Sequence, residues 1–368
     1  MTGPRRIAQV VGNMNGGGVE AVVMNYYRAI DRSRYQFDFF VTQASSQIPR
    51  DEIEGLGGRV FLMPSLSRPD QLVPFLRDSF ASNSYAIVHS HVNTLSVFPL
   101  MAAKRAGVPI RIAHSHSTAG KGEHLRNCMK YSLRCFANVY PTMRIGCSRY
   151  AATWLFGDKA PFVILPNAID TARFKSDSDI RKRIRSEMGA DDSTLVIGHI
   201  GRFMEQKNHA FLLKIFQDLT AREPNCLLVL AGTGPLLDRM RNLAGELGVS
   251  ERVRFLGQRR DASALYQGFD VFCLPSLYEG LPVVGVECQA SGTPILASDA
   301  MTRETAMTHI MRFESLEAPP GQWADELIGM RSLHASPADM QAVRQFDIHV
   351  NAAKLSGLYD SALRAFDE

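Results

Sequence analysis

The sequence is short of the features that several protein classes require. Its six cysteines are scattered, and none forms a CxxC pair or the spacing of a zinc site. We therefore expect reduced thiols in a cytoplasmic protein. No apolar run approaches the roughly 18 residues of a membrane span, and the apolar stretch near the N-terminus is too short for a signal peptide.

Charge is ordinary in amount but unevenly placed. The formal net charge of the 368 residues is +4. Residues 1–175 carry 21 Lys+Arg against 11 Asp+Glu, a net of +10, whereas residues 176–368 carry 20 against 26, a net of −6. The chain is longer than a single hydrophobic core usually supports, so we predict two domains. The excess of positive charge in the first indicates that it faces an anionic partner.

Short apolar runs alternate with helical patterns in both halves of the chain. Such strands, separated by helices, indicate parallel sheets covered on both faces. We predict an α/β fold of two doubly wound, Rossmann-like domains facing each other across a cleft, with ligands beyond the carboxyl ends of the strands. The expected strands are 6–12, 37–42, 59–63, 86–90, 110–115, 144–148 and 162–166, and then 195–201, 226–232, 253–257, 270–275 and 294–298.

A glycine run follows the first strand in "GNMNGGGVEAVVMNYY". Gly16, Gly17 and Gly18 would let backbone approach a ligand, and a helix N-terminus favours anions, although a tight turn explains the run equally well. The spacing matches neither a P-loop nor GxGxxG, so a nucleoside triphosphatase and a dinucleotide dehydrogenase lose their main support.

Two cations follow the first strand of the second half, in "GRFMEQKN". Arg202 and Lys207 stand just before a predicted helix, where cations and free amides suit a diphosphate. The turn "AGTGP" places Gly232 and Gly234 after the next strand, where backbone could approach a nucleotide, but this signal alone is weak.

Four histidines stand at the ends of two neighbouring strands. His89 and His91 end one, and His114 and His116 end the next. A zinc site here would need three of them, so structural histidines bonded to backbone are the better interpretation for His89 and His114. We expect His116, the outermost, to lie in the cleft.

Two glutamates lie eight positions apart in "SLYEGLPVVGVECQASGTP". Glu279 follows a strand, and Pro282 suits the first position of a helix over 282–291. Glu287 would then lie about two turns inside that helix. A buried carboxylate needs partners, which the adjacent hydroxyls of a sugar or ribose can supply, and a diphosphate fits the helix N-terminus.

Taken together, these motifs strongly resemble the retaining GT-B glycosyltransferases of family 4. The resemblance rests on "NGGGVE", "AHSHS", "CSRYAATWL", "VILPNAIDTARF", "GRFMEQKN", "AGTGPLLDRM" and the segment with the two glutamates. "RIAHSHS" and "SDAMTRETAMT" look most like the branch that builds bacterial exopolysaccharide and capsule. The resemblance implies a retaining hexosyltransferase that uses a nucleotide-sugar, expected to be a UDP-sugar, and a saccharide or polyprenyl-diphosphate-linked saccharide acceptor.

The resemblance also implies residue roles and domain bounds. His116 and Glu279 would serve catalysis beside the donor sugar, and Glu287 would hold the ribose. The remaining donor-site residues would be Gly17, Gly18, Arg202, Lys207, Gly234, Gln258, Arg259, Gly280, Leu281 and Val283. Residues 1–175 would bind the acceptor and 176–345 the nucleotide-sugar, with a helix over 346–368 packing back towards the N-terminal domain.

We expect no metal and no other cofactor. The single Asp-x-Asp, Asp177–Asp179, lies in a charged stretch with no strand leading into it, which disfavours a metal-dependent GT-A enzyme. Three competing interpretations are a noncatalytic nucleotide-sugar sensor, an epimerase, and a phosphorylase-like enzyme that would need a lysine-bound pyridoxal phosphate. After Asp299 the family's Gly-Gly-x-Pro-Glu pattern is replaced by "AMTRETAMT", which leaves contacts from that loop undetermined.

The segment 121–140 is basic and amphipathic. Lys121, Arg126, Lys130 and Arg134 alternate there with Leu125, Met129, Leu133 and Phe136. A helix packed on its own domain would give the same pattern. With the resemblance added, we expect reversible contact with an anionic membrane surface on the cytoplasmic side, and no nucleic-acid partner.

Overall fold

The computed structural model describes residues 3–117 and 124–367. The chain forms two compact units, one of Met1–Ile169 with Phe346–Glu368 and the other of Asp170–Gln345. From the sequence we placed the first boundary at residue 175 and the second at 345. Among the described residues no helix is long and apolar enough to span a bilayer.

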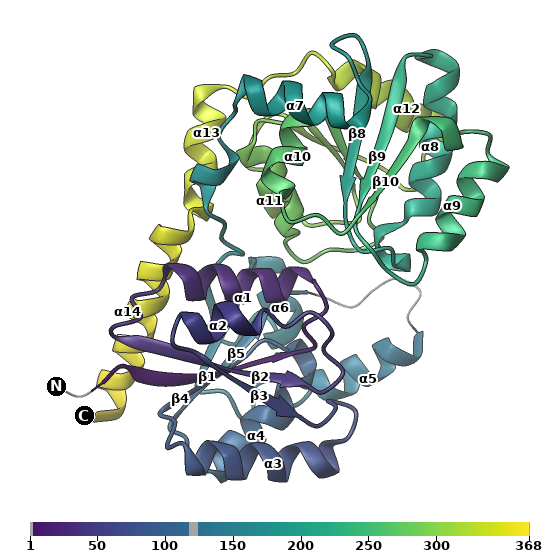
Figure 1. Cartoon of the computed structure of the whole chain (residues 1–368). Helices are drawn as coiled ribbons and strands as arrows, with labels where there is room; N and C mark the ends of the chain where they lie inside the picture. Colours follow the sequence, from purple (N-terminus) through teal and green to yellow (C-terminus); the bar gives the residue numbers. More distant parts are fainter. Residues whose placement is uncertain (1–2, 118–123, 368) are drawn as a thin grey trace. The chain divides into compact units, whose positions relative to one another are not determined.

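The first unit contains a seven-stranded parallel sheet in the order β3-β2-β1-β4-β5-β6-β7 (Figure 1). Its strands coincide with the seven predicted apolar runs to within a few residues, because each run is a short apolar stretch of the kind that forms strands in parallel sheets. The strands are β1 (Arg5–Gly12), β2 (Tyr35–Thr42), β3 (Arg59–Met63), β4 (Ile87–Ser90), β5 (Ile110–Ser115), β6 (Met143–Gly146) and β7 (Val163–Ile164).

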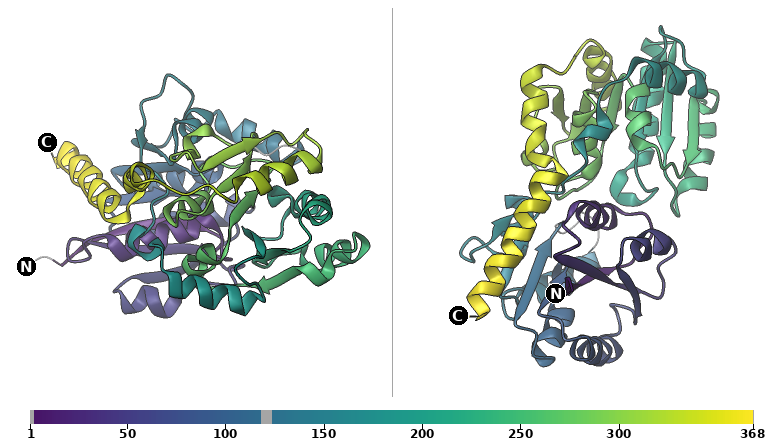
Figure 2. Two further views of the ribbon diagram at one scale, coloured as in Figure 1. Left: turned by 90° about the horizontal axis from the view of Figure 1, so that it is seen from above. Right: turned by 60° about the vertical axis from the view of Figure 1, so that its left-hand side comes forward.

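Helices cover both faces of this sheet. On one face, α3 and α4 pack together, and their apolar side chains form a core with those of β1, β2 and β4. On the other, α1 packs against the long C-terminal helix α14 (Figure 2). The helices of the unit are α1 (Gly18–Ala29), α2 (Arg50–Gly55), α3 (Pro69–Ser82), α4 (Val97–Arg105), α5 (His124–Arg134), α6 (Arg149–Phe156) and α14 (Ile348–Asp367), with the 3-10 turn η1 (Asn93–Ser96).

The second unit contains a six-stranded parallel sheet in the order β10-β9-β8-β11-β12-β13. Five strands match the predicted runs, namely β8 (Leu195–Ile200), β9 (Cys226–Ala231), β10 (Val253–Gly257), β11 (Val271–Leu274) and β12 (Ile295–Ser298). The sixth, β13 (Met311–Glu314), was not predicted. It lies at the sheet edge, where only Met311 is buried, so it lacks an apolar run.

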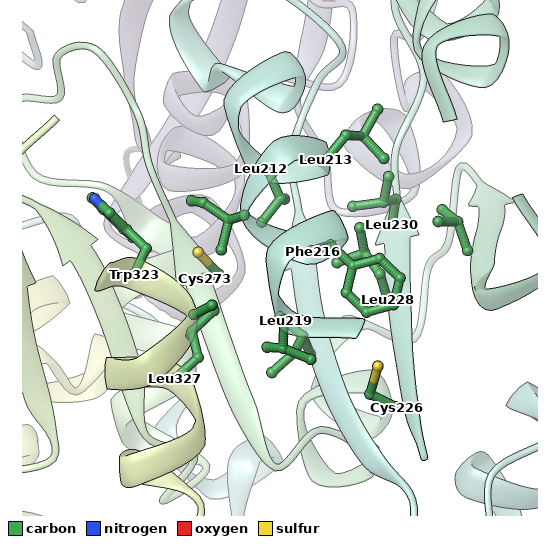
Figure 3. Close-up of a cluster of buried hydrophobic side chains, with 14 of the residues drawn as sticks. Leu212, Leu213, Phe216, Leu219, Cys226, Leu228, Leu230, Cys273, Trp323 and Leu327 are labelled. Atoms are coloured by element: carbon green, nitrogen blue, oxygen red, sulfur yellow. The ribbon is translucent and has the colours of Figure 1, made fainter. Parts of the chain in front are cut away.

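A core of buried side chains joins this sheet to helices α8 and α12. Figure 3 shows Leu212, Phe216 and Leu219 of α8 beside Leu228 and Leu230 of β9, with Trp323 and Leu327 of α12 alongside. The helices are α7 (Ser178–Met188), α8 (His209–Arg222), α9 (Leu237–Glu246), α10 (Ala262–Gly268), α11 (Val283–Ala290), α12 (Pro320–Met330) and α13 (Pro337–Val343). Short 3-10 turns are η2 (Thr171–Phe174), η3 (Glu205–Lys207), η4 (Ser250–Arg252), η5 (Arg303–Thr305) and η6 (Arg344–Phe346).

Each sheet has a point where the strand order reverses direction. In the first unit it lies between β1 and β4, and in the second between β8 and β11. The connections leaving the two strands at such a point run to opposite sides, and ligands of open α/β sheets bind in the crevice between them. Both switch points carry the motifs singled out in the sequence.

Candidate active site

An ion pair lies at the switch point of the second unit. Lys207, in η3 after β8, places Nζ 2.7 Å from Oε1 of Glu279, which follows β11. The amide of Gln206 donates to the other oxygen of Glu279 at 3.2 Å and to the carbonyl of Tyr278 at 2.9 Å. The two charged side chains are only 16% and 10% exposed, so each charge depends on the other to offset the cost of its removal from water.

Glu287 lies just over one turn into the helix that follows, α11 (Val283–Ala290), rather than the two turns that we expected. Its Oε2 accepts from the Tyr266 hydroxyl of α10 at 2.9 Å. Burial raises the pKa of Glu287 to about 7, although Tyr266 and Arg173 act against the shift. We expected the helix over 282–291 with Pro282 at its first position. The helix instead spans Val283–Ala290 and Pro282 is its N-cap, since its ψ of 121° is extended.

The loop that carries Arg202 packs closely against the backbone of the turn at residues 232–234. Gly232 and Gly234, with φ of +142° and +155°, lie so close to it that an added Cβ would stand 2.1 Å from the Gly201 carbonyl oxygen and 2.5 Å from that of Phe203. Gly234 therefore has a close-packing role that the sequence did not reveal. Arg202 itself is exposed, and its guanidinium bonds to no residue that the structure describes.

The other predicted donor-site residues follow β10 and β11. Gln258 is exposed, and its side-chain oxygen accepts from the Thr233 hydroxyl at 3.4 Å. The Arg259 guanidinium is held by Asp261 at 2.6 and 2.7 Å and also lies 3.4 Å from Glu187. Gly280, Leu281 and Val283 are buried at the start of α11, beside Glu279.

At the first unit's switch point, the glycine loop is already bound to a carboxylate. Gly17 is the N-cap of α1, and its amide donates to Oε2 of Glu20 at 2.6 Å. The Asn15 amide donates to the same oxygen at 3.0 Å. Gly18, the first helical residue, is exposed. We did not predict a role for Glu20, although an acidic residue at the third helical position is the mark of a capping box.

The four histidines come together at the same edge. His116, just beyond β5, is buried, and burial lowers its pKa to about 4. Its Nδ1 lies 3.1 Å from Oδ1 of Asn167 and its Nε2 lies 3.0 Å from Nδ1 of His91. Both ring nitrogens of His116 therefore already have protein partners.

Three of these histidines also have the spacing of a metal site. One ring nitrogen from each of His89, His91 and His114 lies within 4.8 Å of the others. His89 and His91, however, use both ring nitrogens in contacts with other side chains, so an ion would have to displace those bonds. The expectation of backbone-bonded structural histidines is incorrect for His89, whose partners are Tyr359 and His114.

The two remaining sequence motifs have structural roles. The loop that replaces the family's Gly-Gly-x-Pro-Glu pattern is held by Gln289 of α11, which donates to the Thr305 carbonyl and accepts from the amides of Met307 and Thr308. Asp177 is the N-cap of α7 and accepts from the amides of Asp179 and Ile180, so its carboxylate caps a helix.

Comparisons with known proteins decide the family. The model for "Glycosyl transferases group 1" matches residues 180–309, and that for "Glycosyltransferase Family 4" matches residues 16–173. A relative from Bacillus subtilis (strain 168), named "Putative glycosyltransferase EpsF", is 37% identical over 333 residues, which are 88% of this chain and 87% of that protein. The chain belongs to the group 1, family 4 glycosyltransferases.

More distant relatives agree with this assignment. The glycosyltransferase is 24% identical over 302 residues to the Escherichia coli "UDP-Gal:alpha-D-GlcNAc-diphosphoundecaprenol alpha-1,3-galactosyltransferase", covering 77% of this chain and 76% of that one. Anabaena HepE in complex with UDP and glucose superposes with a TM-score of 0.82 at 18% identity, over 97% of this chain and all of the other. The lipopolysaccharide glycosyltransferase WaaG superposes at 0.75. The predicted α/β GT-B fold is confirmed.

The raised pKa of Glu287 gives the free energy of unfolding a pH dependence of definite sign. Between about pH 4.5 and 7 the folded glycosyltransferase keeps a proton that the unfolded chain has released, so this group's contribution to stability falls as the pH rises. Glu287→Gln cannot titrate there. The melting temperature of the variant minus that of the wild type should therefore become more positive from pH 5 to pH 8 in thermal melts. A difference that stays constant or becomes more negative would contradict the raised pKa.

Proposed function

We propose that this glycosyltransferase moves a hexose from a UDP-sugar to a saccharide, carried on polyprenyl diphosphate, in exopolysaccharide or capsule assembly. The configuration at the transferred carbon would be retained, and no metal ion would take part. The observation that carries the proposal is the Lys207–Glu279 pair at the β8/β11 switch point, together with Arg202 on the same loop, which bonds to no described residue.

The cations suit a leaving diphosphate. Breaking the bond between the sugar and the diphosphate builds negative charge on the phosphate oxygens, and preorganised cations stabilise such charge without reorganisation. Arg202 can meet it directly. Lys207 would exchange Glu279 for a phosphate oxygen, which would leave Glu279 to accept from the sugar hydroxyls.

The carboxylate of Glu287 suits the ribose. Two neighbouring hydroxyls can donate to one carboxylate, and Glu287 keeps one oxygen that does not contact Tyr266 in the described structure. Ribose binding favours the ionised form, so the nucleotide would lower the raised pKa of this group. In this arrangement the acceptor hydroxyl attacks from the face that the diphosphate leaves, with a leaving phosphate oxygen as base.

The relatives support the choice of substrates. The Escherichia coli galactosyltransferase is named for UDP-Gal and a diphosphoundecaprenol-linked acceptor, and HepE has been solved with UDP and with UDP-glucose. The name EpsF of the 37% identical relative favours exopolysaccharide synthesis.

Variants of the two glutamates separate the nucleotide from the sugar. Glu287→Ala should weaken UDP binding roughly tenfold or more, since a hydrogen bond to a charged group contributes about 1.5–3 kcal/mol. Glu279→Ala should lower turnover more than it lowers UDP affinity. Calorimetry with UDP, and transfer or hydrolysis assays over a panel of UDP-sugars, measure both.

Controls make this test specific. Glu326→Ala removes a half-exposed carboxylate on α12 and should change neither quantity. Arg202→Ala should lower kcat without lowering the melting temperature, whereas Lys207→Ala should lower both, because it leaves Glu279 without its cation. Equal UDP affinity of the wild type and Glu287→Ala would refute the ribose assignment.

Activity should survive removal of metal ions. Arg202 and Lys207 occupy the role that a divalent cation has in metal-dependent transferases, so EDTA should leave the rate of transfer unchanged within about twofold. Dialysed enzyme assayed with EDTA, and again after addition of excess magnesium or manganese, provides the measurement. Loss of activity that either ion restores would instead indicate a metal-dependent mechanism.

The amphipathic segment is partly visible in the structure. Residues 121–123 lie outside the described part, and α5 ends at Arg134, so the later residues form turns rather than the expected helix. Met129, Tyr131, Phe136 and Val139 are nevertheless 49–54% exposed. Arg134 lies 5.7 Å above the Trp154 ring. Apolar side chains beside cations are suited to an anionic membrane surface.

We expect reversible binding to anionic vesicles that salt weakens. Each Lys or Arg near such a surface contributes about 1 kcal/mol at most. Charge reversal at Arg126, Lys130 and Arg134, or Phe136→Ser, should reduce flotation with anionic vesicles and leave UDP binding intact. Val350→Ser, at a 61% exposed position on α14, is the matched control. Equal flotation with neutral and anionic vesicles at low salt would make this segment an ordinary protein surface.

A further inference from the structure

Seven buried side chains of the first unit form one continuous series of hydrogen-bond contacts, here called the histidine chain. Its order is Asn167, His116, His91, Gln9, Tyr359, His89 and His114. The successive contacts measure 3.1, 3.0, 2.8, 3.2, 2.9 and 3.3 Å. Six members come from the sheet or its carboxyl edge, and Tyr359 comes from α14 at the other end of the sequence.

The first three contacts need one hydrogen more than two neutral histidine rings can supply. They run from the Asn167 oxygen through the His116 and His91 rings to the Gln9 oxygen, and each needs one hydrogen. The two oxygens can only accept, and a neutral imidazole supplies one N–H. Two neutral rings therefore supply two hydrogens for three contacts.

An imidazolium could supply the third hydrogen, but burial opposes it. Burial lowers the pKa of His116 to about 4 and that of His91 well below its usual range. Near neutral pH the remaining solution is a half-turn of one side-chain amide, which exchanges its oxygen for its NH2 group.

Each amide turn orients the whole series. If Asn167 turns, it donates to Nδ1 of His116, and every later contact then donates in the same direction, so all four histidines carry hydrogen on Nε2. If Gln9 turns, it donates to Nε2 of His91 and accepts from Tyr359. Every contact then runs the other way, and all four histidines carry hydrogen on Nδ1.

We propose that Gln9 and Tyr359 are positioning residues that hold His116 and the other three histidines in one shared tautomer. The Tyr359 hydroxyl is the bridge, because it lies between Gln9 and His89 and can donate to only one of them. The C-terminal helix thus sets the protonated nitrogen of a residue at the first unit's carboxyl edge. Any effect on catalysis rests on the proposed function and on the place beside the donor sugar that the family resemblance implies for His116. The shared tautomer depends on neither.

Nitrogen-15 NMR of the histidine rings in the full-length enzyme at pH 7.5 tests the proposal directly. The chemical shifts of Nδ1 and Nε2 report the fraction of each tautomer. In the wild type the four rings should show the same ratio of Nδ1–H to Nε2–H. In Tyr359→Phe the bridge is lost, so the ratio for His89 and His114 should separate from that for His91 and His116. Single-histidine variants assign the resonances.

Two further variants make the test decisive. Tyr35→Phe removes another buried hydroxyl that bonds to α14, through Asp360, and should leave the ratios equal. Gln9→Met interrupts the series next to Tyr359. The tautomer ratios of His89 and His114 should then differ from those of His91 and His116, as in Tyr359→Phe. The second variant keeps the test available if the first fails to fold. Unequal ratios in the wild type, or equal ratios in both cut variants, would overturn the proposal.

Kinetics separate this inference from the proposed function. Turnover of a UDP-sugar by Tyr359→Phe should fall by up to roughly tenfold at unchanged donor KM, the scale of one neutral hydrogen bond, and Tyr35→Phe should retain its activity. If the ratios separate but turnover is unchanged, the shared tautomer stands and the assignment of His116 to the reacting centre fails.

Discussion

The ion pair between Lys207 and Glu279 is the interaction on which the second unit's site depends. It joins the connections that leave β8 and β11 in the middle of the sheet, at the place where the strand order reverses. Because both groups are largely buried, neither tolerates the loss of the other without an uncompensated charge. A diphosphate is a ligand that can take the place of Glu279 at Lys207 and preserve that compensation.

The first unit buries titratable histidine rings with no ion pair to them among the described residues. Its carboxyl edge gathers four histidines, and burial keeps the pKa of each below its usual range, so the cluster is neutral near pH 7. A neutral imidazole ring carries one N–H. The direction of each hydrogen bond in the cluster is therefore set by the tautomers of the rings rather than by charge. At the glycine loop of the same edge, the carboxylate of Glu20 takes the amides that a ligand anion could have used.

Most of the fold could be predicted because the strands are apolar runs. Twelve runs were expected and each overlaps a strand, whereas β13, in which only Met311 is buried, lacks an apolar run and was missed. The residues that bind to one another were harder to predict. Lys207 and Glu279 were both expected at the site, but their pairing depends on the neighbourhood of β8 and β11 in space. Tyr266 and Tyr359 carried no signal, since each is a buried aromatic residue whose hydroxyl partner comes from a distant segment.

These partners explain why the free enzyme carries so little unpaired charge at its predicted site residues. Lys207 is paired with Glu279, Arg259 with Asp261, and Glu287 is largely protonated below about pH 7. Within the described residues, Arg202 is the predicted donor-site cation left without a partner. A dianionic ligand would therefore meet Arg202 first and recruit Lys207 by exchange. In the proposed mechanism, Arg202 would therefore make the first contact with the diphosphate, and Glu279 would turn to the sugar only after the phosphate has bound.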